Sequence, residues 1–91
     1  MSRDVLSVQP LAGHRMRVTF DDGVEGIVNV GELVRFTGVF RPLEDPAFFA
    51  RATVNAELGT VCWPNDADLD SDVLYATITG APIPEYVTAR K

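Results

Sequence analysis

The sequence predicts an α+β fold: an antiparallel sheet of about five strands, a meander plus a hairpin, with two or three short helices packed on it. Three observations lead to this class. Apolar and polar side chains alternate over residues 14–20, which is the period of a strand with one buried face. Residues 53–63 form two short β-prone runs with a glycine between them. Residues 72–79 have apolar side chains at helical spacing, and Gly80 follows as a stop signal.

The composition indicates one folded domain. A chain of 91 residues is long enough for a single core. Its 46% hydrophobic and 23% charged residues are typical of a globular protein rather than a disordered one. No run reaches the ~18 apolar residues that suggest a membrane span, and no long apolar segment follows the first charged residues. The single Cys62 cannot form an internal disulfide, so we expect a cytoplasmic protein.

Acidic residues dominate the second half of the sequence. The net charge is −5, and residues 57–85 contain six acidic side chains and no basic one. Such a balance disfavours binding to a phosphate backbone, which depends on Lys and Arg. We therefore expect a small protein partner with basic character, no membrane association and no direct binding of nucleic acid.

The first thirty residues predict a three-stranded meander. Met16, Val18 and Phe20 point to one side of the best-defined strand, with Arg15, Arg17 and Thr19 on the other. The turn residues at 21–23 reverse the chain, and a third strand follows over 24–30. The meander is expected to extend from residue 4 to residue 30.

Two short helices are predicted next. Residues 31–36 have helical apolar spacing, and Gly38 ends that helix. Asp45 is an N-cap followed by Pro46 at the first helical position, so a helix of one or two turns runs through residues 48–50. The adjacent phenylalanines at 48 and 49 cannot both occupy a narrow apolar stripe, so one is expected to be partly exposed.

The second half predicts a hairpin, a main helix and a tail. Strands over 53–57 and 60–63 are joined by Leu58-Gly59, and Pro64 ends the second one. Asp70 or Ser71 caps the helix over 72–79. We treat residues 1–80 as the domain and residues 81–91, which include two prolines, as an extended or disordered tail.

Alternating carboxylates at 66, 68, 70 and 72 invite comparison with a calcium loop, but the pattern fails. Counted from Asp66, the required glycine is Ser71 and the required glutamate is Thr77. One carboxylate capping a helix, with the others solvated, explains the run more simply. We expect no metal and no cofactor.

The remaining chemically suggestive residues have ordinary structural interpretations. His14 is expected to be an exposed turn residue, and Cys62 a small buried hydrophobe. Trp63 is assigned to the core, with an interface anchor as the alternative. The face with Arg15 and Arg17 is a solvated sheet face or a small basic patch. No catalytic residue is predicted; the candidate interaction residues are Arg15, Arg17, Trp63, Asp66 and Asp68.

Several stretches of the sequence together are typical of one known family. They are Arg15–Gly23, Gly38–Phe40, Pro42-Leu43, Asp45-Pro46, Gly59–Val61, Trp63–Asn65, Ala67–Leu69 and Leu74-Tyr75. In these stretches, which cover most of the chain, the sequence resembles a family of small bacterial proteins known only as a domain of unknown function, DUF2442. Asp66 departs from the pattern, because the family usually has Asn-Gly where this chain has Asn65-Asp66.

The resemblance implies a compact α+β domain and little about activity. Genes of such proteins often neighbour another small uncharacterised domain, an arrangement similar to toxin and antitoxin pairs, and some relatives join the domain to a helix-turn-helix. No catalytic residues are carried over. We expect a protein-interaction or regulatory module, such as the antitoxin-like partner of a small protein. The alternative is an accessory domain of a DNA-linked transcriptional regulator, and a small enzyme is the least favoured class.

Overall fold

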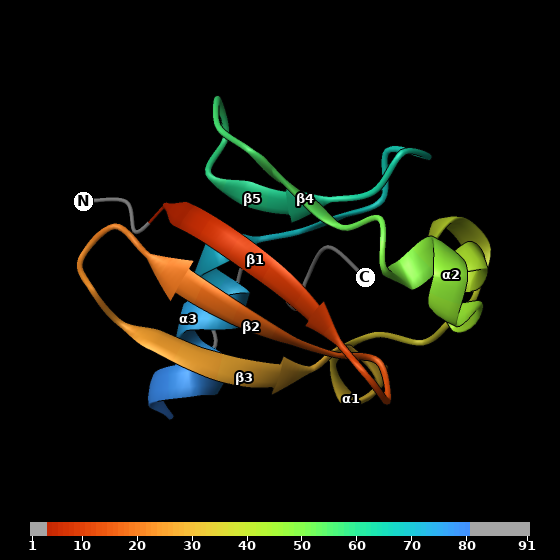
Figure 1. The fold of residues 1–91 in the computed structure, drawn as a ribbon, viewed down its shortest axis with the longest axis horizontal. Helices are drawn as coiled ribbons and strands as arrows, with labels where there is room; N and C mark the ends of the chain where they lie inside the picture. The colour runs from red at the N-terminus through yellow and green to blue at the C-terminus, as the bar shows by residue number, and fades with distance from the viewer. Residues whose placement is uncertain (1–3, 81–91) are drawn as a thin grey trace.

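The computed structural model describes residues 4–80, which form two small antiparallel sheets with short helices around them (Figure 1). This confirms the α+β class. The first sheet contains β1 (Val5–Leu11), β2 (Arg15–Phe20) and β3 (Glu25–Asn29) in that order. It is the predicted meander, with the turn at residues 21–23 between β2 and β3. The predicted tail, 81–91, lies outside the described residues.

The second sheet contains β4 (Thr53–Asn55), β5 (Thr60–Cys62) and β6 (Asp68–Leu69), so the strands number six in two sheets rather than about five in one. The sequence did not predict β6. Its two residues pair with β5 only because the chain reverses tightly after Trp63. The Trp63 amide donates to the Ala67 carbonyl (2.9 Å), and the Asp66 amide donates to the Trp63 carbonyl (3.0 Å).

The connection between β4 and β5 is longer than predicted. β4 ends at Asn55, whose Oδ1 accepts hydrogen bonds from the amides of Glu57 (3.0 Å) and Leu58 (3.1 Å). The predicted two-residue turn is therefore wrong, because the Asn55 side chain organises a turn over residues 56–59. Gly59 has the positive φ expected of it, +71°. Its carbonyl accepts from the Val5 amide (2.9 Å), which links the two sheets.

The helices before the second sheet are short. α1 (Val30–Leu33) begins earlier and ends earlier than the predicted helix over 31–36. Gly38, at φ +56°, does not end a helix but begins the 3-10 helix η1 (Gly38–Glu44), which was not predicted. α2 (Pro46–Phe49) has the predicted cap, since Asp45 Oδ1 accepts from the Ala47 amide (3.0 Å). Phe49 is buried and Phe48 half-buried, as expected.

The main helix, α3 (Ser71–Thr79), confirms both predicted ends. Asp70 Oδ1 accepts from the Asp72 amide (2.8 Å), and Gly80 is left-handed at φ +79°. α3 packs on β3, where Gly26 leaves room for Ile78. A Cβ at Gly26 would lie 2.6 Å from Ile78 Cγ2, so the close approach of helix and strand requires glycine. No helix within residues 4–80 has the length and apolar character needed to cross a membrane.

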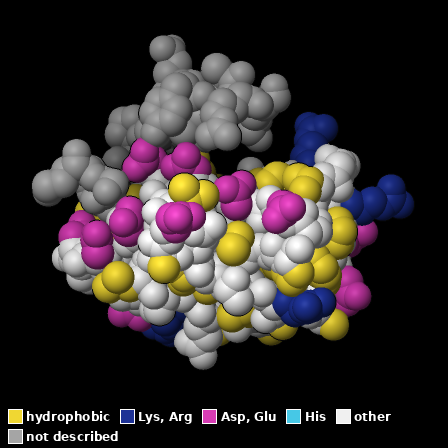
Figure 2. Space-filling view, turned by 90° about the horizontal axis from the view of Figure 1, so that it is seen from above, with side chains coloured by type: hydrophobic (Ala, Val, Ile, Leu, Met, Phe, Trp, Pro, Cys, Tyr) yellow, Lys and Arg dark blue, Asp and Glu magenta, His cyan; other side chains and the backbone are white. Residues whose placement is uncertain are grey.

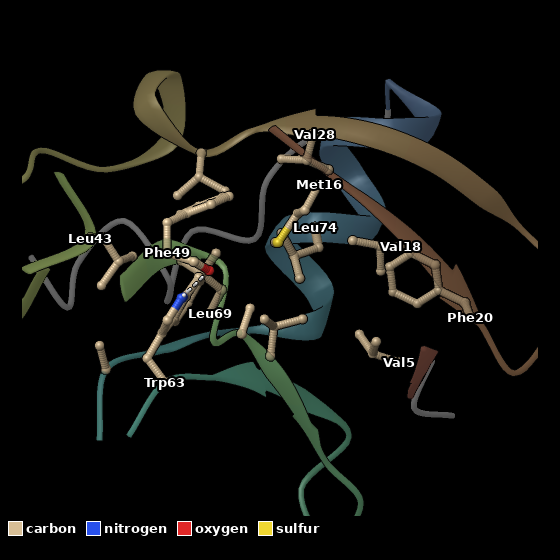
Figure 3. Close-up of a cluster of buried hydrophobic side chains, with 14 residues drawn as sticks. Val5, Met16, Val18, Phe20, Val28, Leu43, Phe49, Trp63, Leu69 and Leu74 are labelled. Carbon is tan, nitrogen blue, oxygen red and sulfur yellow. Dashed lines mark hydrogen bonds between the residues drawn. The ribbon is translucent and has the colours of Figure 1, made fainter. Parts of the chain in front are cut away.

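One core joins the two sheets and the helices (Figure 3). Trp63 is 3% exposed, which confirms its assignment to the core. Its Nε1 donates to the Phe49 carbonyl (3.0 Å), so the residue that follows β5 is bonded to the end of α2. The buried cluster comprises Val5, Met16, Val18, Phe20, Val28, Val30, Leu43, Phe49, Ala52, Val61, Trp63, Ala67, Leu69 and Leu74.

Candidate functional site

An open groove of about 810 Å³ lies beside β6, between the chain around η1 and the start of α3. One wall comes from the end of α1 and the beginning of η1, and the other from residues 66–70 and Val73. The wall residues are therefore about thirty positions apart in sequence. Its apolar members are Leu33, Val34, Val39, Phe40, Ala67, Leu69 and Val73.

Carboxylates dominate the charged residues of the groove. Asp66, Asp68 and Asp70 line it, and Arg35 is the one basic lining residue among residues 4–80. Asp66 and Asp68 are exposed, whereas Asp70 is partly buried and caps α3. The groove therefore combines an apolar surface with a net negative rim, a combination suited to a basic and partly apolar ligand.

The two walls are connected by Asn65. Its Nδ2 donates to the Val39 carbonyl (2.8 Å) in η1, and its Oδ1 accepts from the Ala67 amide (3.3 Å). Directly after it, Asp66 adopts φ +71°, the left-handed conformation that glycine accepts most readily. The positive φ is thus present in this chain although the position is not glycine. These bonds hold the acidic rim in a defined position relative to η1.

Among the polar side chains that line the groove, Thr60 has a buried oxygen that makes no hydrogen bond within residues 4–80. Its Oγ1 is buried and has no hydrogen-bond partner among the described residues. A buried hydroxyl without a partner costs free energy, typically about 1–3 kcal/mol by mutational data.

Arg15 and Arg17 do not belong to this groove. They lie on the outward face of β2, because Met16 and Val18, which alternate with them, are buried. Arg17 forms an ion pair with Glu25 across the strands (3.3 Å), and Arg15 Nε donates to the Ala12 carbonyl (3.1 Å). Of the two basic side chains on this face, Arg17 is therefore neutralised by Glu25, whereas the charge of Arg15 is not neutralised within residues 4–80. Of the five candidate interaction residues, the structure brings only Asp66 and Asp68 to the groove, and Trp63 is buried in the core.

Figure 2 shows the wider charge distribution on the face seen from above. Acidic side chains are spread among hydrophobic ones, whereas Lys and Arg side chains gather mainly toward the end that contains α2 and η1. Residues 4–80 contain 12 Asp and Glu side chains and 5 Arg side chains. The acidic character of the domain is therefore a surface property as well as a compositional one.

His14 is not the exposed turn residue that was predicted. It does occupy a turn, at φ +58°, but the imidazole is half-buried against the rings of Phe36 (4.9 Å) and Phe49 (5.3 Å). Its Nε2 donates to the Glu44 carbonyl (3.0 Å), so the ring fastens the β1–β2 turn to η1. The sequence could not indicate this, because Glu44 is thirty residues away.

Cys62 is half-buried rather than fully buried. Its Sγ lies 3.6 Å from Thr53 Oγ1 on the neighbouring strand. Within residues 4–80, no three His, Cys, Asp or Glu side chains are placed to hold a metal ion together.

The groove's apolar wall was missed by sequence reasoning. The available signal was Gly38-Val39-Phe40, where two large apolar residues follow a glycine outside any strong helix pattern. Val39 is 47% exposed, so part of its apolar side chain is accessible at the groove.

The comparisons with known proteins now identify the family. The family described as "Protein of unknown function (DUF2442)" matches residues 5–80. The chain belongs to this family. Among curated proteins, none matches the DUF2442 chain.

A solved structure is also similar: "Putative DNA Binding Protein NE0471" from Nitrosomonas europaea ATCC 19718. The TM-score is 0.73 at 28% sequence identity, and the match covers 88% of this chain and 51% of the other. This DUF2442 chain therefore spans about half the length of that protein.

Proposed function

We propose that this DUF2442 domain is a protein-interaction module whose groove binds a basic, partly apolar segment of a small partner protein. The observation that carries the proposal is the groove itself, with apolar walls and three Asp against one Arg in its lining. Burial of apolar side chains would supply most of the affinity, at about 25 cal/mol per Å² removed from water. The carboxylates would add orientation and a faster association rate.

The second candidate is an accessory domain of a DNA-linked regulator. The name of the Nitrosomonas europaea protein favours it, and about half of that protein's chain lies outside the match. The two roles are compatible if DNA is contacted by another domain and this one binds protein. Direct DNA contact by residues 4–80 has weaker support, because Arg17 is paired with Glu25 and acidic side chains outnumber basic ones by 12 to 5.

We do not propose an enzyme. His14 is used in packing and in a bond to the Glu44 carbonyl, and Cys62 contacts Thr53, so both have structural roles. An antitoxin-like role, in which the domain binds one small protein tightly, is a specific form of the interaction proposal. The groove provides a surface for such a partner.

The proposal is tested with two synthetic peptides of equal length and identical apolar residues, one with Lys and one with Glu at every polar position. Amide chemical shifts of the ¹⁵N-labelled domain are recorded during each titration. The Lys peptide should shift the signals of Ala67, Asp68 and Val73, because these residues line the groove. The Glu peptide, which has the same apolar residues, should need a clearly higher concentration to produce the same shifts, because its carboxylates are repelled by the acidic rim. Shifts confined to other surfaces would refute the groove as the binding site.

Variants make the test specific. Asp66→Gly and Asp68→Asn should each weaken binding of the Lys peptide, and Asp66→Gly keeps a left-handed backbone without strain. Asp21→Asn removes an exposed carboxylate of the β2–β3 turn outside the groove and should leave binding unchanged. A duplex-DNA titration of the same domain separates the candidates. Tight binding that falls steeply with salt would favour the regulator and contradict the protein-binding proposal.

A further inference from the structure

The first sheet has an open edge at β3, whereas β1 at its other edge contacts β4 and β5, and the Val5 amide there donates to the Gly59 carbonyl (2.9 Å). The strand order is β1-β2-β3, and no other strand of residues 4–80 pairs with β3 (Figure 1). Its core face is covered by α3 through Gly26 and Ile78, but that contact does not use the strand's edge. An open edge has backbone amides and carbonyls available for another strand.

The groups available at this edge follow from the register. The Phe20 amide donates to the Val24 carbonyl (2.8 Å), and the Val30 amide donates to the His14 carbonyl (2.9 Å). Bonded and non-bonded positions alternate between these two ends of the antiparallel ladder. The pairs Val18↔Gly26 and Met16↔Val28 are therefore bonded, whereas residues 25, 27 and 29 direct their backbone groups away from β2.

The edge is self-complementary. When two β3 strands are placed antiparallel with Ile27 at the two-fold axis, Ile27 faces its own copy and Glu25 faces Asn29. The backbone amides of these three residues all point away from β2, and Asn29 is the N-cap residue of α1. No like-charged side chains face each other in this register. Ile27 is 49% exposed, so its apolar side chain gains a partner across the axis.

We propose that two copies of this chain associate through β3, in antiparallel register centred on Ile27, to form a continuous six-stranded sheet. The interface is isologous, as expected for a two-fold dimer. The Arg17–Glu25 ion pair remains intact, because both side chains stay on the outward face. The dimer is independent of the groove's ligand, so either proposal can fail without the other.

The test is the mass of the purified chain by sedimentation equilibrium over a range of concentrations. The parent should approach twice 9.9 kDa as concentration rises. Ile27→Glu should remain at 9.9 kDa, because two carboxylates would meet at the axis. Within the monomer this Glu would face Arg17, a favourable pairing that keeps the sheet folded. Leu6→Glu is the matched control, since Leu6 is also exposed (62%) but lies on β1, at the other edge. It should still dimerise.

A second pair of variants tests the register independently of Ile27. Asn29→Asp places a carboxylate against Glu25 of the other copy and should weaken the dimer. Asn29→Lys places an ammonium there and should strengthen it. A parent that stays at 9.9 kDa at every concentration overturns the proposal. So does a loss of the dimer in Leu6→Glu, or a shift of the dissociation constant in the same direction for both Asn29 variants.

Discussion

Replacement of Trp63 by alanine should strongly destabilise the domain. Trp63 is 3% exposed, its ring lies 5.9 Å from that of Phe49, and its Nε1 donates to the Phe49 carbonyl. Truncation of a buried Trp to Ala typically costs about 3–5 kcal/mol. Domains of this size have roughly 5–14 kcal/mol of stability at 0.05–0.15 kcal/mol per residue, so Trp63→Ala should unfold a large fraction of molecules or lower the melting temperature by ~12–40 °C.

Trp63→Phe separates the hydrogen bond from the packing. The Phe49 carbonyl also accepts from the Ala52 amide (3.2 Å), so loss of the indole N–H does not leave that oxygen unsatisfied. The hydrogen-bond contribution is therefore the ordinary net value of about 1 kcal/mol rather than a full desolvation penalty. The phenyl ring keeps an aromatic contact with Phe49, so the total loss should be well below that of the alanine variant.

The measurement is urea denaturation followed by far-UV circular dichroism, since Trp63 is the single tryptophan and its fluorescence disappears in both variants. Leu58→Ala is the control: Leu58 is 60% exposed, and its truncation should change the free energy of unfolding by less than about 0.5 kcal/mol. A Trp63→Ala midpoint within experimental error of Leu58→Ala would refute the core role.

Three further stability predictions use the same assay. Gly26→Ala should destabilise the domain by about 1–3 kcal/mol, because the new methyl group would overlap with Ile78. Most of that loss should disappear in an Ile78→Ala background, and equal losses in both backgrounds would contradict the contact. Asp70→Ala should lower stability by about 1 kcal/mol, whereas Asp70→Asn should preserve the cap; a similar loss in both would assign the effect to charge. Thr60→Val should leave stability unchanged or raise it by about 1 kcal/mol, and a clear loss would mean that the hydroxyl has a partner.

Local chemistry explains which parts of the fold could be predicted. The alternation in β2, the cap at Asp45 with Pro46, and the helix between Asp70 and Gly80 each depend on residues adjacent in sequence, and all three are confirmed. β6 and η1 were missed for the opposite reason. A two-residue strand has no period of its own, and it exists because the turn after Trp63 brings it to β5. η1 is likewise held from outside, by the bond from Asn65 to Val39.

The candidate site likewise contains residues that could be predicted from sequence and residues that could not. The acidic residues Asp66 and Asp68 were singled out from sequence, because a run of alternating carboxylates is visible there. The apolar wall opposite them was not, since Val39 and Phe40 come from a segment about thirty residues earlier. The pairing of Arg17 with Glu25 depends on the register of β2 and β3, which the sequence alone does not give. This pairing decides how much positive charge the face with Arg15 and Arg17 keeps.

Asp66 connects the fold to the proposed function. Its backbone is left-handed at φ +71°, a conformation in which a side chain costs energy relative to glycine. Glycine would satisfy the turn without that cost, so the backbone gives no reason for a carboxylate. Its side chain has no bond within residues 4–80 and lies exposed at the groove. The physical effect of Asp at this position is therefore to add negative charge to the rim, where the basic segment of the proposed partner would meet it.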